Sequence, residues 1–430
     1  MRLAVPTSRP LSRLTETRLL FWVAAITVTG FFTVALALGQ GLDGNAFIVP
    51  TAFLVIAFVV HAALAMRGLR GDQIMLPVSL GLTGIGLIVI YRVTAGTDAA
   101  SLLTLQLAWF VVAMAAFLLP LFVPRDLSLL SRYKYTWMTF GLLLLVATVV
   151  RGEEINGARS WFRLGPLSFT PWELVKIVLV VFLAAYLDEY REVIASRRGI
   201  WRVLPPPPYL VPIVAMAFAA MFILAFEKDI GATLVFFGIF LAMLYLGTGR
   251  ATYVVAGVAI LIPAAYVVYR LYAHVQLRVE MWQNPWQDAL GSGYQILHGL
   301  FSLGNGGLLG AGLGAGDPQS IPVVWSDFVF AAFAEETGFI GALALLAMYL
   351  VLLYRGFSIA IAAPTTFLQL LAAGLTFVIG MQTLVIVAGN AKLIPLTGIT
   401  LPFVAYGGSS LVTNFLSIGL LLRISAESRT

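Results

Sequence analysis

The chain has 430 residues, a mean hydropathy of +0.96 and a formal net charge of +6; 60% of its residues are hydrophobic and only 11% are charged. Soluble domains carry about 25% charged residues, so this composition excludes an ordinary soluble protein and favours a single polytopic membrane domain. The absence of cysteine excludes disulfides, Cys-ligated zinc and thiol nucleophiles.

Twelve apolar stretches follow one another along the chain, and each is long enough to cross a bilayer core of about 30 Å. They lie near 18–39, 46–66, 74–93, 102–123, 135–150, 171–187, 209–226, 230–247, 251–272, 327–354, 364–389 and 404–424. The expected fold is therefore all-α: a polytopic integral membrane helical bundle of about 12 helices. The large polar segment before the third-last helix is expected to lie outside the membrane.

The placement of the basic residues predicts the orientation. If the N-terminus is cytoplasmic, 17 of the 26 Lys and Arg fall in inner segments, and each short inner loop obeys the positive-inside rule. The other nine lie outside or within spans: Arg92, Arg151, Arg159, Arg163, Lys176, Lys228, Arg270, Arg278 and Lys392. The net charge thus indicates membrane topology, with both termini cytoplasmic and the 278–326 segment outside, and not a nucleic-acid partner.

The outer segment from Arg278 to Glu336 is dense in Trp, Pro, Gly, Asn, Gln and carboxylates. Long irregular segments are uncommon and usually functional, and at membrane depth they survive only where they line a cavity or are buried in protein. We therefore expect the chemistry here. The glycines between 304 and 316 resemble a dinucleotide-binding pattern, but no strand precedes them, so a Rossmann site is excluded.

Polar residues also gather near the start of the 171–187 span. Pro171 suits a helix start, and Glu173 and Lys176, at i and i+3, can pair on one helix face. A Lys inside a span usually serves a cavity or pathway. The alternative is a helix-stabilising ion pair beside interfacial Trp and Arg anchors. The next polar cluster, residues 227–229, can be explained as a polar turn between two helices.

Glu335 and Glu336 are expected about two turns inside the helix that starts near Asp327. Deep carboxylates need a partner or a wet cavity, and Lys176 and Lys392 are the available intramembrane cations. The small residues between 389 and 410 permit close helix packing, or backbone N–H groups that face an anionic ligand. Together these clusters predict a polar cavity that opens outward, but they do not identify its substrate.

These stretches resemble the SEDS family (shape, elongation, division and sporulation), the RodA, FtsW and SpoVE proteins. The matching segments occur in the family's order: NGARSWFRLG with PWELVK, KDIGAT, NPWQDALGSGYQ, GGLLGAGLG, SDFVFAAFAEETGFIG and IPLTGITLPFVAYGGSS. The family usually has ten spans. The resemblance therefore implies a membrane glycosyltransferase core at 74–424, with a catalytic loop at 271–326. A cytoplasmic tail and two additional helices precede it at 1–73, and a short tail follows at 425–430.

The resemblance implies a peptidoglycan glycosyltransferase of the bacterial cytoplasmic membrane, active in cell elongation or division. Such an enzyme polymerises lipid II onto a growing glycan strand, within membrane lipid and beside a class B penicillin-binding transpeptidase, and it releases undecaprenyl pyrophosphate. This chemistry is compatible with a divalent cation, Mg or Mn, as cofactor. No nucleotide or organic cofactor and no nucleic-acid partner is expected.

The family's catalytic carboxylate lies in an NP-x-x-D element, which corresponds to Asp288. Glycan extension needs an acceptor sugar hydroxyl to attack an anomeric carbon that bears a polyprenyl pyrophosphate, and a carboxylate within reach can take the proton. The leaving group needs positive charge from Arg, Lys or a metal ion. Without the resemblance, a helix N-cap before Ala289 explains Asp288 equally well.

Further substrate-binding candidates follow from the same resemblance. The cations expected near the pyrophosphate are Arg159, Arg163, Lys176 and Lys392; the remaining candidates are Glu173, Asp327, Glu335, Glu336 and Ser409. The chain departs from the family pattern at Glu227-Lys228, Trp172 and Ala405, and none of these departures touches Asp288.

Three other functions compete with polymerisation. A transporter that flips lipid-linked precursor would explain twelve spans and a charged cavity, and a scaffold would only recruit the transpeptidase. Both would tolerate Asp288→Asn. Ligation of another lipid-linked glycan would share the chemistry and differ in the acceptor.

Overall fold

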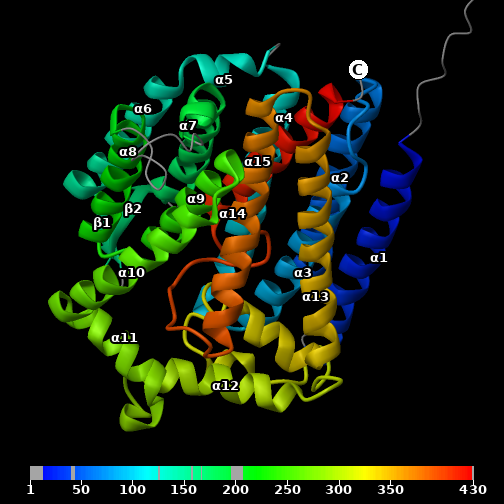
Figure 1. Ribbon diagram of the computed structural model, residues 1–430. Helices are drawn as coiled ribbons and strands as arrows, with labels where there is room; N and C mark the ends of the chain where they lie inside the picture. The colour runs from blue at the N-terminus through cyan, green and yellow to red at the C-terminus, as the bar shows by residue number, and fades with distance from the viewer. Residues whose placement is uncertain are drawn as a thin grey trace, which may run out of the picture.

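The computed structural model describes residues 13–39, 44–123, 126–155, 158–165, 167–194 and 207–428, and these form a bundle of long helices (Figure 1). The first half contains α1 (Leu14–Ala37), α2 (Gly44–Met66), α3 (Met75–Thr94), η1 (Asp98–Ala100), α4 (Ser101–Phe122), α5 (Ser128–Arg132), α6 (Lys134–Arg151), β1 (Glu153–Ile155), β2 (Ala158–Leu164), β3 (Leu167–Phe169) and α7 (Pro171–Ile194). The second half contains α8 (Pro207–Phe226), α9 (Ile230–Thr248), α10 (Ala251–Leu271), α11 (Ala273–Gln283), η3 (Pro285–Asp288), α12 (Tyr294–Gly306), η4 (Pro318–Ser320), α13 (Val329–Ala362), α14 (Thr366–Asn390) and α15 (Gly408–Glu427).

The predicted helical bundle is confirmed, since a helix occupies each of the twelve predicted ranges. Ten helices within the described ranges are long and apolar enough to cross a membrane. α6 and α7 are not among these ten, so their spanning stays a prediction. A small antiparallel sheet, of order β1-β2-β3, was not predicted and joins α6 to α7.

The core lies along α3, α14 and α15, whose most apolar stretches are 89%, 72% and 83% buried. Peripheral helices instead turn large apolar side chains outward, such as Trp22 of α1 and Phe222 of α8, which suits contact with lipid. Close approach depends on small residues: a Cβ at Gly408 would lie 2.1 Å from the ring of Trp109. The small residues after 400 therefore allow α15 to pack against α4.

The outer segment is more regular than expected. The prediction of an irregular 271–326 loop is wrong in part, because α11 and α12 both form within it and lie across one end of the bundle (Figure 1). The Trp, Pro and Gly residues that suggested a loop are concentrated between and after these helices, where they form η3 and the glycine loop, which we define as residues 307–316.

The glycine loop fills a break in α13. Gly338 has a φ of +69° and interrupts the helix, which frees backbone groups that cannot stay unpaired at membrane depth. Four backbone hydrogen bonds join the loop to the two sides of the break: Ala311 N to Glu335 O, Gly312 N to Glu336 O, Phe339 N to Gly307 O and Ile340 N to Leu308 O. These hydrogen bonds hold the loop against both sides of the break in α13.

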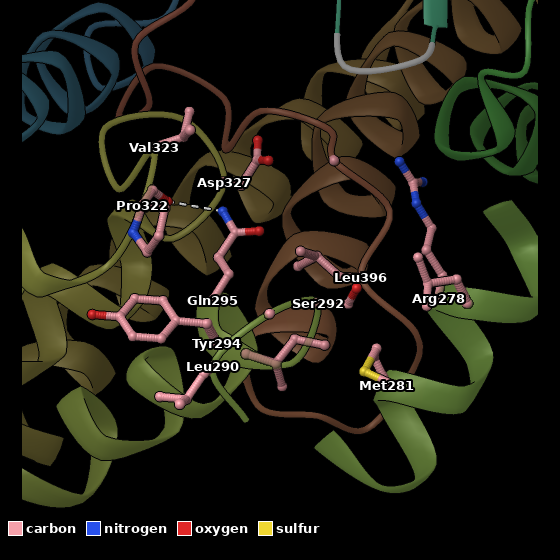
Figure 2. Close-up of a pocket in the computed structure, with 14 residues that line it drawn as sticks. Arg278, Met281, Leu290, Ser292, Tyr294, Gln295, Pro322, Val323, Asp327 and Leu396 are labelled. Carbon is pink, nitrogen blue, oxygen red and sulfur yellow. Dashed lines mark hydrogen bonds between the residues drawn. The ribbon is translucent and has the colours of Figure 1, made fainter. Parts of the chain in front are cut away.

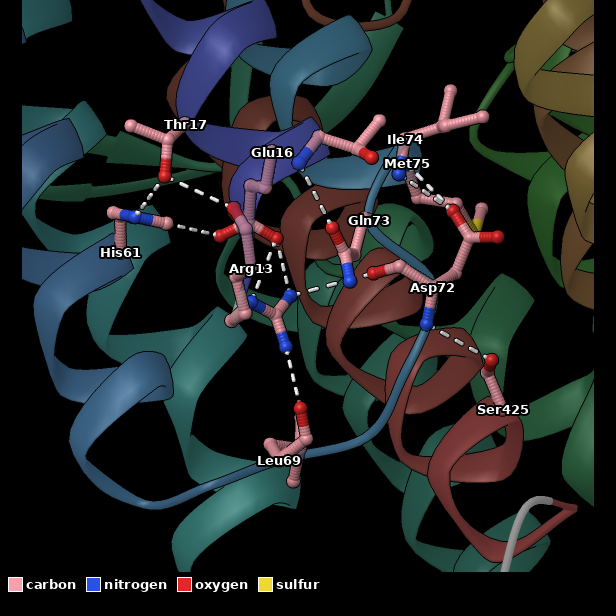
Figure 3. Close-up of polar contacts among 11 residues, drawn as sticks. Arg13, Glu16, Thr17, His61, Leu69, Asp72, Gln73, Ile74, Met75 and Ser425 are labelled. Atoms are coloured by element: carbon pink, nitrogen blue, oxygen red, sulfur yellow. Dashed lines mark hydrogen bonds and ion pairs between the residues drawn. The ribbon is translucent and has the colours of Figure 1, made fainter. Parts of the chain in front are cut away.

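Buried charges fix α1 to the bundle at the end where α15 terminates (Figures 1 and 3). Glu16 is fully buried and pairs with Arg13 and with Nδ1 of His61 on α2. Asp72, after α2, pairs with Arg355 of α13. Because removing one partner of a buried pair leaves an uncompensated charge, these contacts hold the ends of α1, α2 and α13 in place.

Candidate functional site

A cavity of about 490 Å³ lies between the predicted outer segment and the loop that joins α14 to α15 (Figure 2). Its lining comes from α11, from the turn after η3, from the start of α12 and from two loops: Leu277, Arg278, Met281, Leu290, Gly291, Ser292, Tyr294, Gln295, Ile296, Pro322, Val323, Asp327, Leu396 and Gly398. The lining is mostly apolar with one cation, one carboxylate and a few hydroxyl and amide groups. This mixture is typical of sites for organic ligands of moderate size.

Asp288 does not itself line this cavity, but it is hydrogen-bonded to Ser292, which does. Its side chain is exposed, and its Oδ2 accepts a hydrogen bond of 2.7 Å from the backbone N–H of Ser292. A Cβ at Gly291 would lie 2.4 Å from Oδ2, so a side chain at position 291 would displace the carboxylate. The N-cap interpretation is wrong: α12 begins only at Tyr294, and Asp288 ends η3 and closes a turn.

Arg278 and Asp327 line the cavity from different elements (Figure 2). Arg278 Nη1 donates to the backbone O of Thr397 at 3.5 Å. Burial raises the pKa of Asp327, and a hydrogen bond from Ser326 and the charge of Arg278 oppose this effect. Asn390 donates to the backbone O of Asp327 at 2.8 Å, which ties it to α14. The cavity thus offers a guanidinium and a carboxyl that holds its proton more readily than an exposed aspartate.

The predicted pairing of Glu173 with Lys176 is confirmed. Both side chains are buried; Lys176 Nζ also donates to Gln382 of α14 at 2.8 Å, and Thr413 of α15 donates to Glu173 at 3.3 Å. Ser409 is buried beside them, and its Oγ accepts from the backbone N–H of Thr170 at 2.8 Å. This cluster joins α7, α14 and α15 and does not line the cavity.

The expected partners of Glu335 and Glu336 are wrong. Glu336 pairs with Arg92 of α3 at 2.6 Å, and Glu335 Oε1 accepts from the backbone N–H of Asp317 at 3.0 Å. Lys176 is already paired within α7. Lys392 has a φ of +57° and lies in a loop, where its backbone O accepts from the indole of Trp282 at 3.0 Å. Arg92 was missed because it is 244 residues from Glu336 in the sequence.

The two remaining predicted cations lie on β2. The side chain of Arg159 is outside the described residues. Arg163 is 58% exposed and pairs with Glu153 at 3.3 Å. Arg163 does not line the cavity. Among the predicted site residues, Asp327 lines it together with Arg278, whose place in the site was not predicted, and Asp288 contacts the lining through Ser292.

The 227–229 turn is more than a polar link. Asp229 caps α9 by accepting from the backbone N–H of Ala232 at 2.9 Å. Burial raises the pKa of Asp229, and the charge of Arg278 acts against this. Glu227 is buried and accepts a hydrogen bond from Thr148 of α6.

Glu227→Gln is expected to remove part of the pH dependence of stability. Burial raises the pKa of Glu227 from 4.5 to about 7. Between pH 4.5 and about 7, the folded protein therefore keeps a proton that the unfolded chain releases. The free energy of unfolding falls as the pH rises through this range and stays lower above it. The glutamine variant should be more stable above pH 7 by on the order of 2 kcal/mol. Melting temperatures of both proteins between pH 5 and 8 measure this, and parallel pH profiles would contradict it.

The fold and the cavity define an integral membrane protein whose mostly apolar cavity, with a few polar groups, lies between the segment that joins α10 to α13 and the loop that joins α14 to α15. A family model described as "Cell cycle protein", named for FtsW, RodA and SpoVE, matches residues 73–430. The chain belongs to this FtsW/RodA/SpoVE family.

Relatives of known name resemble most of the chain. Peptidoglycan glycosyltransferase RodA of Mycobacterium tuberculosis is 36% identical over 436 residues, which covers 99% of this chain and 93% of that protein. Stage V sporulation protein E of Bacillus subtilis is 37% identical over 309 residues, covering 69% of this chain and 81% of that protein.

Solved structures share the fold. One, described as "Structural coordination of polymerization and crosslinking by a peptidoglycan synthase complex", has a TM-score of 0.69 at 29% identity and covers 84% of this chain and 99% of that chain. The crystal structure of the Thermus thermophilus rod shape determining protein RodA has a TM-score of 0.58 at 28% identity, with the same coverage.

Proposed function

We propose that the chain is a peptidoglycan glycosyltransferase that polymerises lipid II into glycan strands, with release of undecaprenyl pyrophosphate, in cell elongation or division. The names of the relatives, peptidoglycan glycosyltransferase RodA and FtsW, support this activity. The observation that carries it is the exposed carboxylate of Asp288, which is hydrogen-bonded to Ser292 in the wall of a cavity that Arg278 and Asp327 also line. A flippase is not favoured, because the relatives are named for glycosyl transfer.

Asp288 is the proposed general base. The hydrogen bond from Ser292 engages Oδ2 and orients the carboxylate, so we assign the acceptor's proton to Oδ1. The acceptor oxygen forms a bond to the anomeric carbon, and the bond from that carbon to the phosphate oxygen breaks. The electron pair leaves with undecaprenyl pyrophosphate, and the hydroxyl proton moves to Asp288.

Arg278 is the proposed partner of the pyrophosphate, because a planar guanidinium matches phosphate oxygens. Arg163 and Lys392 remain candidates for contact with the outer part of the pyrophosphate. The described part of the chain contains no group of three or more His, Asp or Glu that could hold a metal ion. A Mg or Mn ion would therefore be held by one or two carboxylates together with the substrate's pyrophosphate, and no step is assigned to it. Glu173, Lys176, Glu335, Glu336 and Ser409 are buried, and we propose that they position the helices around the cavity.

The chain is an integral membrane protein, and we propose that it lies in the bacterial cytoplasmic membrane with both termini inside and the cavity outside. The bias of basic residues toward the predicted inner loops supports this orientation. We further propose a class B penicillin-binding transpeptidase as partner, which the likeness to a peptidoglycan synthase complex supports.

Replacing Arg278 is expected to weaken substrate use. Arg278→Gln should lower kcat/KM for lipid II by about 10- to 100-fold because a charge-assisted contact to phosphate is lost. Arg278→Lys should recover only part of this, since lysine cannot bind bidentately. Arg270→Gln is the matched control: Arg270 is exposed, lies at the end of α10 and does not line the cavity. Equal losses in both glutamine variants would contradict the assignment.

The proposed function is tested with the purified wild-type chain, its cognate class B transpeptidase and lipid II. Moenomycin is added to silence contaminating classical glycosyltransferases. Glycan chains are expected. If no chains form while lipid II crosses the membrane of vesicles that carry the protein, the polymerase proposal is overturned in favour of transport.

A further inference from the structure

Helix α1 reaches from the buried charge cluster at one end of the bundle to the glycine loop at the other. At the first end, Arg13 Nη1 donates to the backbone O of Leu69 at 2.8 Å, and Glu16 is fully buried between Arg13 and His61 (Figure 3). These contacts restrain α1 against movement along its own axis.

At its other end, α1 lies against the glycine loop. Gly314 has a φ of +85°, and a Cβ built there would lie 2.4 Å from the Cβ of Ala37, the last residue of α1. No real Cβ atoms approach this closely, so either α1 or the loop would have to shift. The contact depends on the lack of a side chain at position 314.

Helix α3 connects the same loop to α1 by a second route. Phe31 of α1 stacks on Tyr91 of α3, with ring centroids 5.2 Å apart. The next residue, Arg92, donates to the backbone O of Gly316 at 2.7 Å. Gln319 donates to the backbone O of Arg92 at 3.3 Å. The segment 314–319 is therefore held between α1 and α3.

This segment continues directly into the wall of the cavity. Pro322, Val323 and Asp327 line it, and Gln295 of α12 donates to the backbone O of Pro322 at 2.8 Å (Figure 2). Pro322 lies only eight residues after Gly314, and hydrogen bonds hold the segment between them. A shift of the loop at Gly314 would therefore also move the cavity wall.

We propose that α1 is a brace for the cavity: its contact through Ala37 with Gly314 positions the glycine loop and, through it, the wall that carries Asp327. This inference rests on the proposed function. The family model begins only at residue 73, and the similar solved structures leave 16% of this chain uncovered while covering 99% of their own. Mycobacterial RodA, in contrast, aligns with 99% of the chain. The brace is thus a positioning element that lies outside the family model.

The test is a double-mutant cycle in the full chain with its transpeptidase. Gly314→Ala introduces the Cβ that meets Ala37, and Ala37→Gly removes its counterpart. Gly312→Ala is the matched control, because Gly312 also has a positive φ, +103°, but its Cβ would lie 3.7 Å from the nearest atom, an ordinary contact. Both alanine variants carry similar backbone strain, and only one disturbs the brace.

Gly314→Ala is expected to lower kcat for polymerisation about tenfold relative to Gly312→Ala with little change in KM, and the Ala37→Gly/Gly314→Ala double variant should recover most of it. Hydrogen exchange gives an independent measure: the amides of Ala311 and Gly312 should exchange faster in Gly314→Ala and return to normal in the double variant.

Equal rates in Gly314→Ala and Gly312→Ala, or no recovery in the double variant, would overturn the brace while leaving the polymerase intact. If Gly314→Ala does not fold, recovery of folding and activity by Ala37→Gly supports the brace, and failure to recover overturns it. A wild-type protein that makes no glycan would instead overturn the proposed function, and the exchange data would still report on the contact.

Discussion

Asp288→Asn is expected to lower the initial rate of lipid II polymerisation by about 10²- to 10⁴-fold, the usual contribution of a general base. Asparagine has nearly the same shape as aspartate, and its carbonyl oxygen can still accept the 2.7 Å hydrogen bond from Ser292, so the turn after η3 should persist. The amide cannot take a proton from the acceptor hydroxyl. Initial rates with the cognate transpeptidase, in the presence of moenomycin, measure the effect.

Two further variants make this prediction specific. Asp317→Asn changes another exposed carboxylate of the same outer segment that does not line the cavity, and it should polymerise at close to the wild-type rate. Asp288→Glu keeps the base but displaces it, so it should retain partial activity. Wild-type rates in Asp288→Asn would remove Asp288 as the base and shift attention to Asp327.

Lys176→Met is expected to destabilise the protein by about 3–5 kcal/mol, because Glu173 would be left as a buried charge without its partner. Lys176 is fully buried and contacts Glu173 and Gln382, so its loss affects the packing of α7 on α14. We expect a lower melting temperature and little polymerisation. The measurement is thermal unfolding in detergent, followed by the polymerisation assay.

The Glu173→Gln/Lys176→Met double variant separates packing from substrate contact. It removes both charges together, so stability should return toward that of the wild type. We expect polymerisation to return with it, because the contacts of both side chains in the described part of the chain lie within the protein. A stable double variant without activity would contradict this and would assign the pair to substrate binding.

The sequence was sufficient to predict the long apolar helices, because each of them is a continuous stretch of apolar residues. It also predicted the pairing of Glu173 with Lys176, since i and i+3 are neighbours on any helix. The break at Gly338 was not predictable, because it depends on hydrogen bonds to the glycine loop. The helices α11 and α12 were obscured by the Trp, Pro and Gly residues around them.

The site was predictable only where a motif marks it. Asp288 lies in such a motif, whereas Arg278 precedes it and was treated as one charge of a loop. Its role depends on Thr397 and Asp327, which the fold brings close from distant parts of the sequence. In the same way, Arg92 and Glu336 were not predicted to pair, since nothing local to either residue indicates the other.

A single-turnover reaction tests the assignment of Asp288 most directly. Excess enzyme with its transpeptidase is mixed with labelled lipid II, and both lipid II binding and formation of the first glycosidic bond are followed for the wild type and for Asp288→Asn. We predict that the variant binds lipid II within about threefold of the wild type and forms no bond while the wild type completes its turnover. Bond formation in Asp288→Asn at the wild-type rate would contradict the account.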